Sequence, residues 1–443
     1  MKKNFRIFVT VLTLTMLMNS CSSIYVDSPE VTWKSAMDVD PDEEYFTLGS
    51  IYSRQDVDGV TYKDSWIYVE RQEYQRYVRT LSDGTKYYTK DIAERIVKYN
   101  AETGVVSSVC LDPTCSHSPG SECLFLVPDN ATAFVDSIMG DWIFFSYHHH
   151  DPENRALGFL TEAYLYNLTT GESVKISDAT FENREINKMG SFCAHGDKLY
   201  YIMTKLDYSD TGYVEGGSVD GYEPETKITL WELDFNTKKT AELFEVPFEA
   251  GIAAVSNERI YFKEAVGVSS CDHSGNDMKK ESNLDFGMMQ MCGTYGFKFD
   301  YNEQAIKIYD LHTKTAKIIP MEFSFQQCIL TNEGILFSTF STADEEYTKA
   351  IDLAARMKLR HEGTAWIYLM DFDGSNPRRI FEKDKLGITV ACATENYFYG
   401  GVTQIDPENP LENYYYMNSE RHVINRKTGE ITPIPLLDLV LPE

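Results

Sequence analysis

The chain alternates short apolar segments of strand length with short polar turns. Each repeat begins with a triplet of apolar or aromatic residues that follows a polar turn, as in Ile67-Tyr-Val69 and Ile143-Phe-Phe145. Runs of β-branched and aromatic residues of this length predict strands. The six triplets begin at Ile67, Ile143, Leu199, Ile260, Ile335 and Tyr397.

A second marker follows each triplet, where a later apolar run ends on Asn or Asp. Five of the six markers have Thr three positions later, and Gly follows the Thr in three repeats. An Asx side chain caps a tight turn and Gly accepts positive φ, so these residues predict a hairpin. The markers are Asn100, Asn167, Asp234, Asp310, Asp371 and Asn425.

The spacing of the markers predicts the architecture. They lie 54 to 76 residues apart, which leaves room for about four strands in each repeat. Four antiparallel strands repeated six times, with no helical period between them, predict an all-β, six-bladed β-propeller over residues 46–443. A β-sandwich with chance repetition is the alternative, but it does not account for two markers that recur six times in the same order.

The segment Trp366–Ile380 closely resembles the blade signature of TolB-like propellers. The chain after its leader is also similar to bacterial lipoproteins described as low-density-lipoprotein-receptor-type β-propellers, a family without an assigned activity. The resemblance implies a fold and no function, because such blades serve binding proteins and accessory domains of peptidases alike. Prolyl-peptidase relatives need an α/β-hydrolase domain. The sequence has no Gly-x-Ser-x-Gly elbow, and it ends soon after the sixth repeat, so it favours a propeller that is not an enzyme.

Residues 1–20 predict a signal peptide, because three basic residues precede an apolar run from Ile7 to Met18 that is too short to span a bilayer. The following Ser20-Cys21 resembles a bacterial lipobox. This implies lipidation of Cys21 and a protein anchored in the cell envelope, outside the cytoplasm. An ordinary signal peptide with an incidental Cys is the alternative. The polar residues 21–45 predict a tether between anchor and propeller.

The charge of the chain limits which classes of molecule can bind to it. The sequence has 41 basic and 68 acidic residues, for a net charge of −27. Phosphate-rich partners are repelled by such a chain, so nucleic acid is excluded as a partner. The expected contacts are a membrane, through the lipid anchor, and an unknown ligand or envelope protein. The propeller itself is expected to be a monomer.

Long segments separate the second and third strands of every repeat, while the other turns are short. In an up-and-down blade these segments emerge on one face, which predicts a loop-rich recognition face. Its segments are expected near residues 70–94, 147–163, 204–227, 264–304, 339–364 and 402–420. Aromatic residues on this face suit stacking on sugar rings or peptide side chains. The candidate binding residues are Tyr74, Tyr77, Tyr295, Phe297, Tyr414 and Tyr415.

The link between the first two repeats holds a cluster of possible metal ligands. Cys110, Cys115, His117 and Cys123 provide three thiols and one imidazole, which can fill a tetrahedral zinc shell. The spacing is not common among zinc fingers. A disulfide among the three cysteines is the preferred alternative outside the cytoplasm, and unpaired thiols are a third possibility. No other cofactor is expected.

A second pair of cysteines, Cys271 and Cys292, brackets the longest predicted loop and is a disulfide candidate. No zinc-protease motif, phosphate loop or dinucleotide fingerprint occurs in the sequence. We therefore expect a lipid-anchored propeller that binds a glycan, a peptide or an envelope protein through its loop face, without catalysis. An extracellular polysaccharide hydrolase or lyase acting in the propeller funnel, and a structural envelope component, are the alternatives.

Overall fold

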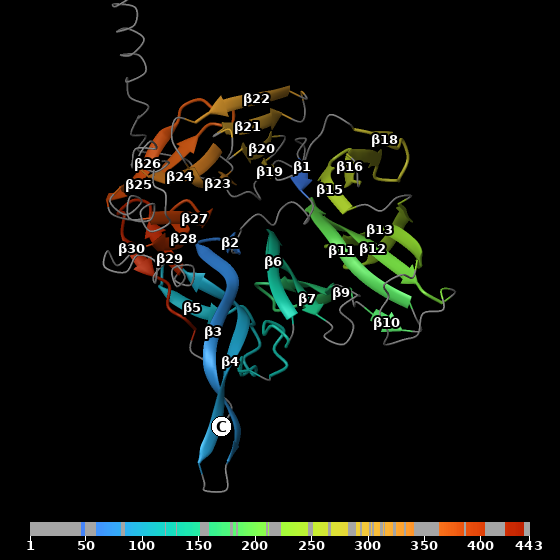
Figure 1. Cartoon of the computed structure of the whole chain (residues 1–443), viewed down its shortest axis with the longest axis horizontal. Coiled ribbons are helices and arrows are strands. Elements are labelled where there is room, and N and C mark those ends of the chain that lie inside the picture. Colours follow the sequence, from blue (N-terminus) through green and yellow to red (C-terminus); the bar gives the residue numbers. More distant parts are fainter. Residues whose placement is uncertain are drawn as a thin grey trace, which may run out of the picture.

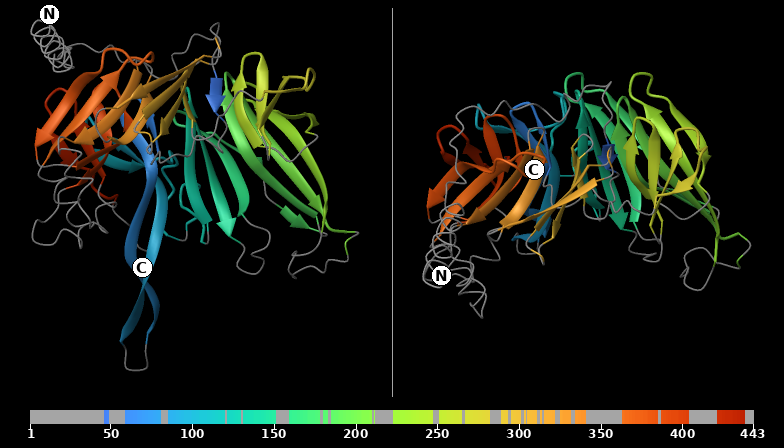
Figure 2. Two further views of the ribbon diagram at one scale, coloured as in Figure 1. Left: turned by 45° about the horizontal axis from the view of Figure 1, so that its top comes forward. Right: turned by 90° about the horizontal axis from the view of Figure 1, so that it is seen from above.

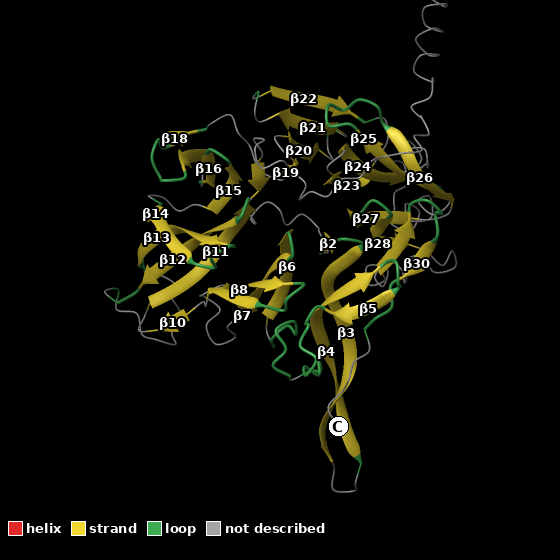
Figure 3. Ribbon diagram, turned by 180° about the vertical axis from the view of Figure 1, so that it is seen from behind, coloured by secondary structure: helices red, strands yellow, loops and turns green. Residues whose placement is uncertain are grey.

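A computed structural model describes much of the chain between Phe46 and Leu437 (Figure 1). The described strands form seven antiparallel sheets set around a ring, so the protein is a seven-bladed β-propeller. Figure 3 shows only strands and loops in the described part, and no helix there is long and apolar enough to cross a membrane. The described residues are 46–48, 59–80, 85–119, 121–129, 131–150, 159–177, 180–182, 185–209, 211, 223–246, 251–264, 267–281, 289–292, 295–300, 303, 305–310, 313, 315–321, 325–331, 334–340, 363–384, 387–403 and 421–437.

The first three blades follow one another along the chain, and the strands of each pair in sequence order. Blade 1 contains β2 (Val60–Tyr62), β3 (Ser65–Thr80), β4 (Lys86–Asn100) and β5 (Val105–Ser108). Blade 2 contains β6 (Ala131–Met139), β7 (Trp142–His150), β8 (Phe159–Asn167) and β9 (Ser173–Ser177). Blade 3 contains β10 (Thr180–Glu182), β11 (Glu185–His195), β12 (Lys198–Asp207), β13 (Glu225–Asp234) and β14 (Thr240–Glu245).

The remaining four blades continue in the same way, except that one strand from the start of the chain joins blade 4. Blade 4 contains β15 (Gly251–Ser256), β16 (Arg259–Lys263), β17 (Val268–Asp272), β18 (Lys279–Lys280) and β1 (Phe46–Leu48), which pairs with β15. Blade 5 contains β19 (Met289–Cys292), β20 (Tyr295–Asp300), β21 (Ala305–Asp310) and β22 (Thr315–Pro320). Blade 6 contains β23 (Phe325–Thr331), β24 (Gly334–Phe340), β25 (Thr364–Met370) and β26 (Arg378–Asp384). Blade 7 contains β27 (Gly387–Ala393), β28 (Tyr397–Thr403), β29 (Arg421–Asn425) and β30 (Ile431–Pro433).

The expectation of six blades is wrong, because the fourth repeat contains two blades. The triplet at Ile260 lies in β16 of blade 4, whereas the next marker, Asp310, ends β21 of blade 5. The marker of blade 4 is Asp272, whose side chain accepts from the N–H groups of Ser274 and Asn276 at 2.9 and 2.8 Å. This turn has Gly three residues after the Asx, as at Asp371, and no Thr. The predicted loop at residues 264–304 therefore contains the last two strands of blade 4 and the first two strands of blade 5.

The predicted Asx turns are confirmed. The Asn100 side chain accepts from the N–H of Thr103 at 2.9 Å, and the Asn100 carbonyl accepts from Gly104 at 2.9 Å. Corresponding side-chain bonds hold the turns at Asn167, Asp234, Asp310 and Asn425. The apolar strands between these turns bury their side chains between neighbouring blades. Blade-to-blade packing of this kind supplies the core of the fold.

Among the described residues, apolar clusters join blades 1 to 2, 2 to 3, 3 to 4, 5 to 6 and 6 to 7, and a further cluster closes the ring between blades 7 and 1. Trp66 and Tyr68 of blade 1 pack with Tyr399 and Val423 of blade 7, and the Trp66 and Tyr399 rings lie 5.8 Å apart. The Tyr399 hydroxyl also donates to the carbonyl of Asp64 at 3.0 Å. Because the described strands of blades 1 and 7 share no sheet, side-chain packing closes the ring here.

Blade 1 carries a two-stranded arm in place of a predicted loop. β3 and β4 pair without interruption from Ser65 with Asn100 to Thr80 with Lys86, apart from one irregularity between Tyr77 and Arg79. Residues 70–80 and 86–94 are therefore strand, and they project beyond the ring of blades (Figures 1 and 2). The expected loops at 341–362 and 404–420 lie outside the described residues.

Candidate metal centre

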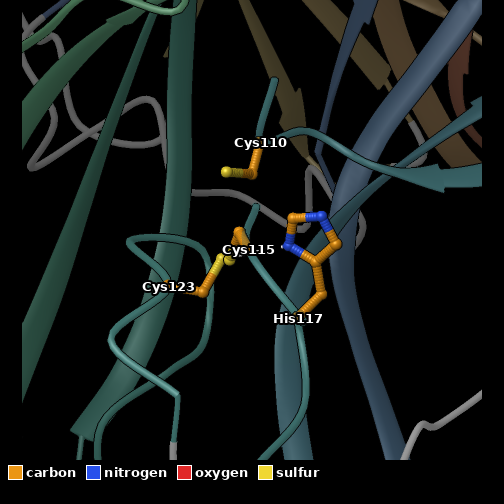
Figure 4. A group of neighbouring side chains, drawn as sticks. All are labelled: Cys110, Cys115, His117 and Cys123. Carbon is orange, nitrogen blue, oxygen red and sulfur yellow. Dashed lines mark hydrogen bonds between the residues drawn. The ribbon is translucent and has the colours of Figure 1, made fainter. Parts of the chain in front are cut away.

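Four possible metal ligands converge in the link between β5 of blade 1 and β6 of blade 2. The sulfur atoms of Cys110, Cys115 and Cys123 and a ring nitrogen of His117 all lie within 4.8 Å of one another. Figure 4 shows the four side chains directed toward a common centre. Cys123 is buried and the other three are half-buried. The four residues named as possible metal ligands in the sequence are therefore neighbours in the structure.

A turn at Asp112 brings Cys115 back toward Cys110. The Cys115 N–H donates to the carbonyl of Asp112 at 3.2 Å, which closes a β-turn with Pro113 at its second position. The Asp112 carboxylate accepts from both the N–H and the hydroxyl of Thr114, at 2.8 and 2.7 Å. Pro presets the φ that such a turn needs, and the Asx side chain caps it. The turn is therefore encoded locally by Asp112-Pro-Thr.

His117 has an unfavourable backbone conformation, and its side chain points to the cluster. His117 has φ of 51°, a left-handed conformation that non-glycine residues adopt at some cost in free energy. Its Nδ1 lies 3.4 Å from the sulfur of Cys123. A second turn, in which the Ser121 N–H donates to the carbonyl of Ser118 at 3.0 Å, returns the chain toward Cys123. The strained residue is thus the one whose imidazole must reach the three thiols.

Both neighbouring blades hold the link in place. On the blade 2 side, the hydroxyl of Tyr166 accepts from the N–H of Leu111 at 2.8 Å, and the hydroxyl of Tyr147 donates to the carbonyl of Leu124 at 2.5 Å. Both tyrosines are buried. The sequence analysis missed these two anchors, because they lie 55 and 23 residues from their partners along the chain.

On the blade 1 side, the link adds a short edge to the sheet at the base of the arm. The Ile96 N–H donates to the carbonyl of Phe125, and the Val127 N–H donates to the carbonyl of Glu94, both at 2.9 Å. The Phe125 side chain is buried between the two blades. The apolar run from Leu124 to Val127 could have indicated this pairing, but the sequence analysis did not use it.

Burial and backbone N–H donors shift the pKa values of the Cys110 and Cys123 thiols in opposite directions. Burial raises the pKa of Cys110, and it raises the pKa of Cys123 to about 12. The N–H groups of Asp112 and Phe125 each donate to the sulfur two residues before them, and these bonds lower the two pKa values. A cysteine binds a metal as a thiolate, and N–H groups that donate to the sulfur stabilise this form. Bound zinc would itself deprotonate the thiols.

The other predicted site residues are not brought together. Tyr74 lies on the arm, where its hydroxyl donates to Asp91 at 3.4 Å. Tyr77 lies in β3, and its side chain is outside the described part. Tyr295 stacks on Phe372 with ring centroids 5.4 Å apart. Phe297 is only 2% exposed in the core between blades 5 and 6, so its proposal as a recognition residue needs correction.

Three predicted positions lie outside the described residues, namely Cys21, Tyr414 and Tyr415. The pairing of Cys271 with Cys292 stays a prediction. Cys271 is a buried free thiol in β17 of blade 4, and Cys292 lies in β19 of blade 5, where its side chain is outside the described part.

No family model matches the sequence, and no curated protein matches it. Among solved structures, an acylaminoacyl peptidase in complex with Z-Gly-Gly-Phe-chloromethyl ketone is 14% identical with a TM-score of 0.45, over 88% of this chain and 52% of that chain. Pyrococcus horikoshii acylaminoacyl peptidase is 13% identical with a TM-score of 0.42, over 91% and 54%. The β-propeller domain of the trilobed protease from Pyrococcus furiosus is 13% identical with a TM-score of 0.40, over 88% and 96%.

This chain spans about half the length of the two acylaminoacyl peptidases. Likeness at this level of identity concerns the β-propeller fold, and no TolB-like or low-density-lipoprotein-receptor-type family is identified. The neighbours include peptidases, an isopeptidase and the propeller domain of a protease, and the expectation of a binding propeller without catalysis is withdrawn.

Proposed function

We propose that this protein is a zinc-binding β-propeller in which Cys110, Cys115, His117 and Cys123 hold one Zn²⁺ ion. The observation that carries the proposal is the convergence of all four donor atoms within 4.8 Å. In a tetrahedral site with zinc–sulfur bonds of about 2.3 Å, two sulfur ligands lie about 3.8 Å apart. A small contraction of the link therefore completes the shell.

The composition of the cluster favours zinc over a disulfide. A disulfide uses two thiols and leaves the third thiol and the imidazole without a role. The described cluster instead orients His117 toward the sulfur of Cys123, at the expense of a left-handed backbone conformation. Thiolate and imidazole ligands in a closed four-coordinate set are the ligands of structural zinc sites.

A metal ion at this position would fix the link, and with it the contacts that the link makes to blade 1 and to blade 2. The link that carries the ligands is hydrogen-bonded to Tyr147 and Tyr166 of blade 2 and to the strand at Ile96 of blade 1. The ion would therefore stabilise the junction of the two blades and the base of the arm. Its role in the proposal is structural, because all four positions around the ion are filled by protein ligands.

The experiment measures bound metal in the full chain purified without added chelator. We expect one zinc per chain by elemental mass spectrometry, and we expect Co²⁺ substitution to give the strong visible absorption of a tetrahedral thiolate site. The variants Cys110→Ser, Cys115→Ser and His117→Ala should each lose the zinc. Cys392→Ser is the matched control, since Cys392 is a half-buried cysteine in blade 7, away from the cluster.

Two results would overturn the proposal. One is full-length protein that is folded, metal-free and unable to take up Co²⁺. The other is a disulfide among Cys110, Cys115 and Cys123, identified by mass spectrometry of peptides alkylated before reduction.

A further inference from the structure

The arm of blade 1 has partner strands only at its base. On one side, β2 pairs with Ser65–Ile67, and on the other side β5 pairs with Val97–Asn100 and the link pairs next to them at Arg95. Among the described strands, residues 68–80 of β3 and 86–93 of β4 pair only with each other. The outer part of the arm is therefore a two-stranded ribbon.

An isolated ribbon of this kind is marginally stable in water, because each strand has a single partner and little apolar surface is buried. The arm exposes apolar side chains, with Val78 48% and Ile92 46% exposed. Its edges also carry charged residues and a register irregularity next to Val78. Natural edges use both features against indiscriminate strand pairing. The exposed apolar side chains of the arm thus favour contact with a partner, while its charged edges and its register irregularity limit which partners can bind.

Charge is divided along the arm. The described outer part, residues 75–80 and 85–90, has four cations and no anion; the cations are Arg76, Arg79, Lys86 and Lys90. At the surface of the base, residues 68–74 and 91–97 have three anions and one cation, which are Glu73, Asp91, Glu94 and Arg71, because Glu70 and Arg95 are buried against each other. The neighbouring link adds exposed acids at Asp112, Glu122 and Asp129. A basic tip and an acidic base therefore occur on one ribbon.

The two charged regions meet at Glu73 and Lys90, but the cations nearest the end of the arm lie well beyond this contact. Six residues separate Glu73 from Arg79, which corresponds to about 20 Å along a strand. The Debye length at physiological ionic strength is about 8 Å. Glu73 and Lys90 are linked at 3.4 Å where the regions meet, but both side chains are largely exposed, so this pair contributes little.

We infer that the arm docks against the arm of a second copy of this chain, in antiparallel orientation around a two-fold axis. In that arrangement the basic tip of each arm lies on the acidic base of the other, so one interface contains two equal contacts. Isologous interfaces have this property, because the same surface serves both subunits. Charge complementarity favours a second copy as the partner. The basic tip attracts an acidic surface, and the base of another arm, on a chain whose net charge is −27, is such a surface.

The test uses charge reversal in full chains that carry two different tags and are expressed together. The tip variant is Arg79→Glu with Lys86→Glu, and the base variant is Glu73→Lys with Asp91→Lys. We expect the two tagged copies of the wild-type chain to purify together. Each variant expressed alone should lower that yield by at least about ten-fold, because like charges then face each other in both contacts.

The decisive measurement combines one tip variant with one base variant. Every contact in the mixed pair again joins opposite charges, so the yield should return to within about two-fold of the wild type. Recovery also shows that both variants are folded. Lys239→Glu with Lys383→Glu, two exposed lysines in blades 3 and 6, repeats the charge change of the tip variant and should leave the yield unchanged.

A photo-crosslinker at Val78 identifies what the arm touches in cells. We expect a product that contains both tags. The inference is overturned if wild-type copies do not purify together, if the mixed pair fails to recover, or if Val78 crosslinks to lipid or to another protein instead.

Discussion

Arg95 and Glu70 form a buried ion pair that holds Leu437, which follows blade 7, against blade 1. The Arg95 guanidinium lies 2.8 Å from Glu70 Oε1, and the two side chains are 4% and 0% exposed. The other Glu70 oxygen accepts from the Leu437 N–H at 3.0 Å, while Arg95 donates to the Leu437 carbonyl. The chain after blade 7 is thus bound to the strands of blade 1. This contact supplements the apolar cluster that closes the ring.

Removing one partner of this pair should destabilise the fold strongly. The variant Arg95→Met leaves the Glu70 carboxylate buried without its counter-ion, which costs about 3–5 kcal/mol in comparable sites. We expect that loss in the free energy of unfolding measured with urea. Lys90→Met is the matched control, because Lys90 and Glu73 are 82% and 69% exposed. It should change stability by less than about 0.5 kcal/mol. Equal effects of the two variants would contradict this account.

Two turn glycines should differ in their tolerance of alanine. Gly104 has φ of 69° with open space around an added Cβ, whereas Gly275 has φ of 80° and its added Cβ would lie 2.7 Å from the Phe244 ring. Gly104→Ala should cost about 1 kcal/mol, from backbone strain alone. Gly275→Ala adds overpacking against blade 3 and should cost about 2–4 kcal/mol. Thermal unfolding of both variants measures the difference, and an equal cost would show that Phe244 moves aside freely.

The Asp112 side chain should affect metal affinity without binding the metal. Its hydrogen bonds to Thr114 lower the pKa of Asp112 and shape the turn between Cys110 and Cys115. Asp112→Ala should weaken zinc binding by about ten-fold, as for other residues that orient metal ligands. Competition with a chromophoric chelator measures this change. Asp129→Ala, an exposed acid in the same link, should leave the affinity unchanged, which separates turn geometry from local charge.

A buried histidine between blades 3 and 4 should make stability depend on pH. Burial lowers the pKa of His195 to about 4, and its Nε2 lies 2.8 Å from Asn257 Oδ1. In the unfolded chain the group takes up a proton near pH 6.5. As pH falls from about 6.5 to about 4, the unfolded state therefore binds more protons and the fold loses about 2–3 kcal/mol. His195→Gln should remove this part of the acid sensitivity in urea titrations at several pH values. An unchanged pH slope would contradict it.

Loss of the metal should be felt at the junction of blades 1 and 2. Chelation of the full chain should lower its thermal midpoint and increase amide exchange in residues 109–127. Blades 4 to 6 lie away from the link along the ring and should keep their exchange rates. A uniform change across all blades would instead indicate that the ion acts on the fold as a whole.

Local chemistry explains which features could be predicted from the sequence. The Asx turns depend on a side chain and backbone groups within four residues, so Asn100 and Asn425 could be recognised directly. The same holds for the Asp112-Pro-Thr turn. Blade 4 was recognised by its triplet at Ile260 but not by its turn, because the turn at Asp272 lacks the Thr of the other repeats and β18 has only two residues. Blade 5 was recognised by its marker Asp310 but not by a triplet, because Gly296 and Lys298 interrupt the apolar run of its second strand.

By itself, the sequence determined that this chain is a propeller of four-stranded blades and that four possible metal ligands share one short link, because turn capping and strand patterning act between near neighbours. Only the tertiary structure decided the number of blades, the convergence of the four donors and the extension of β3 and β4 into an arm. These features depend on contacts between distant residues, such as Tyr147 with Leu124 and Arg95 with Leu437. Such contacts form only when the blades pack around the ring.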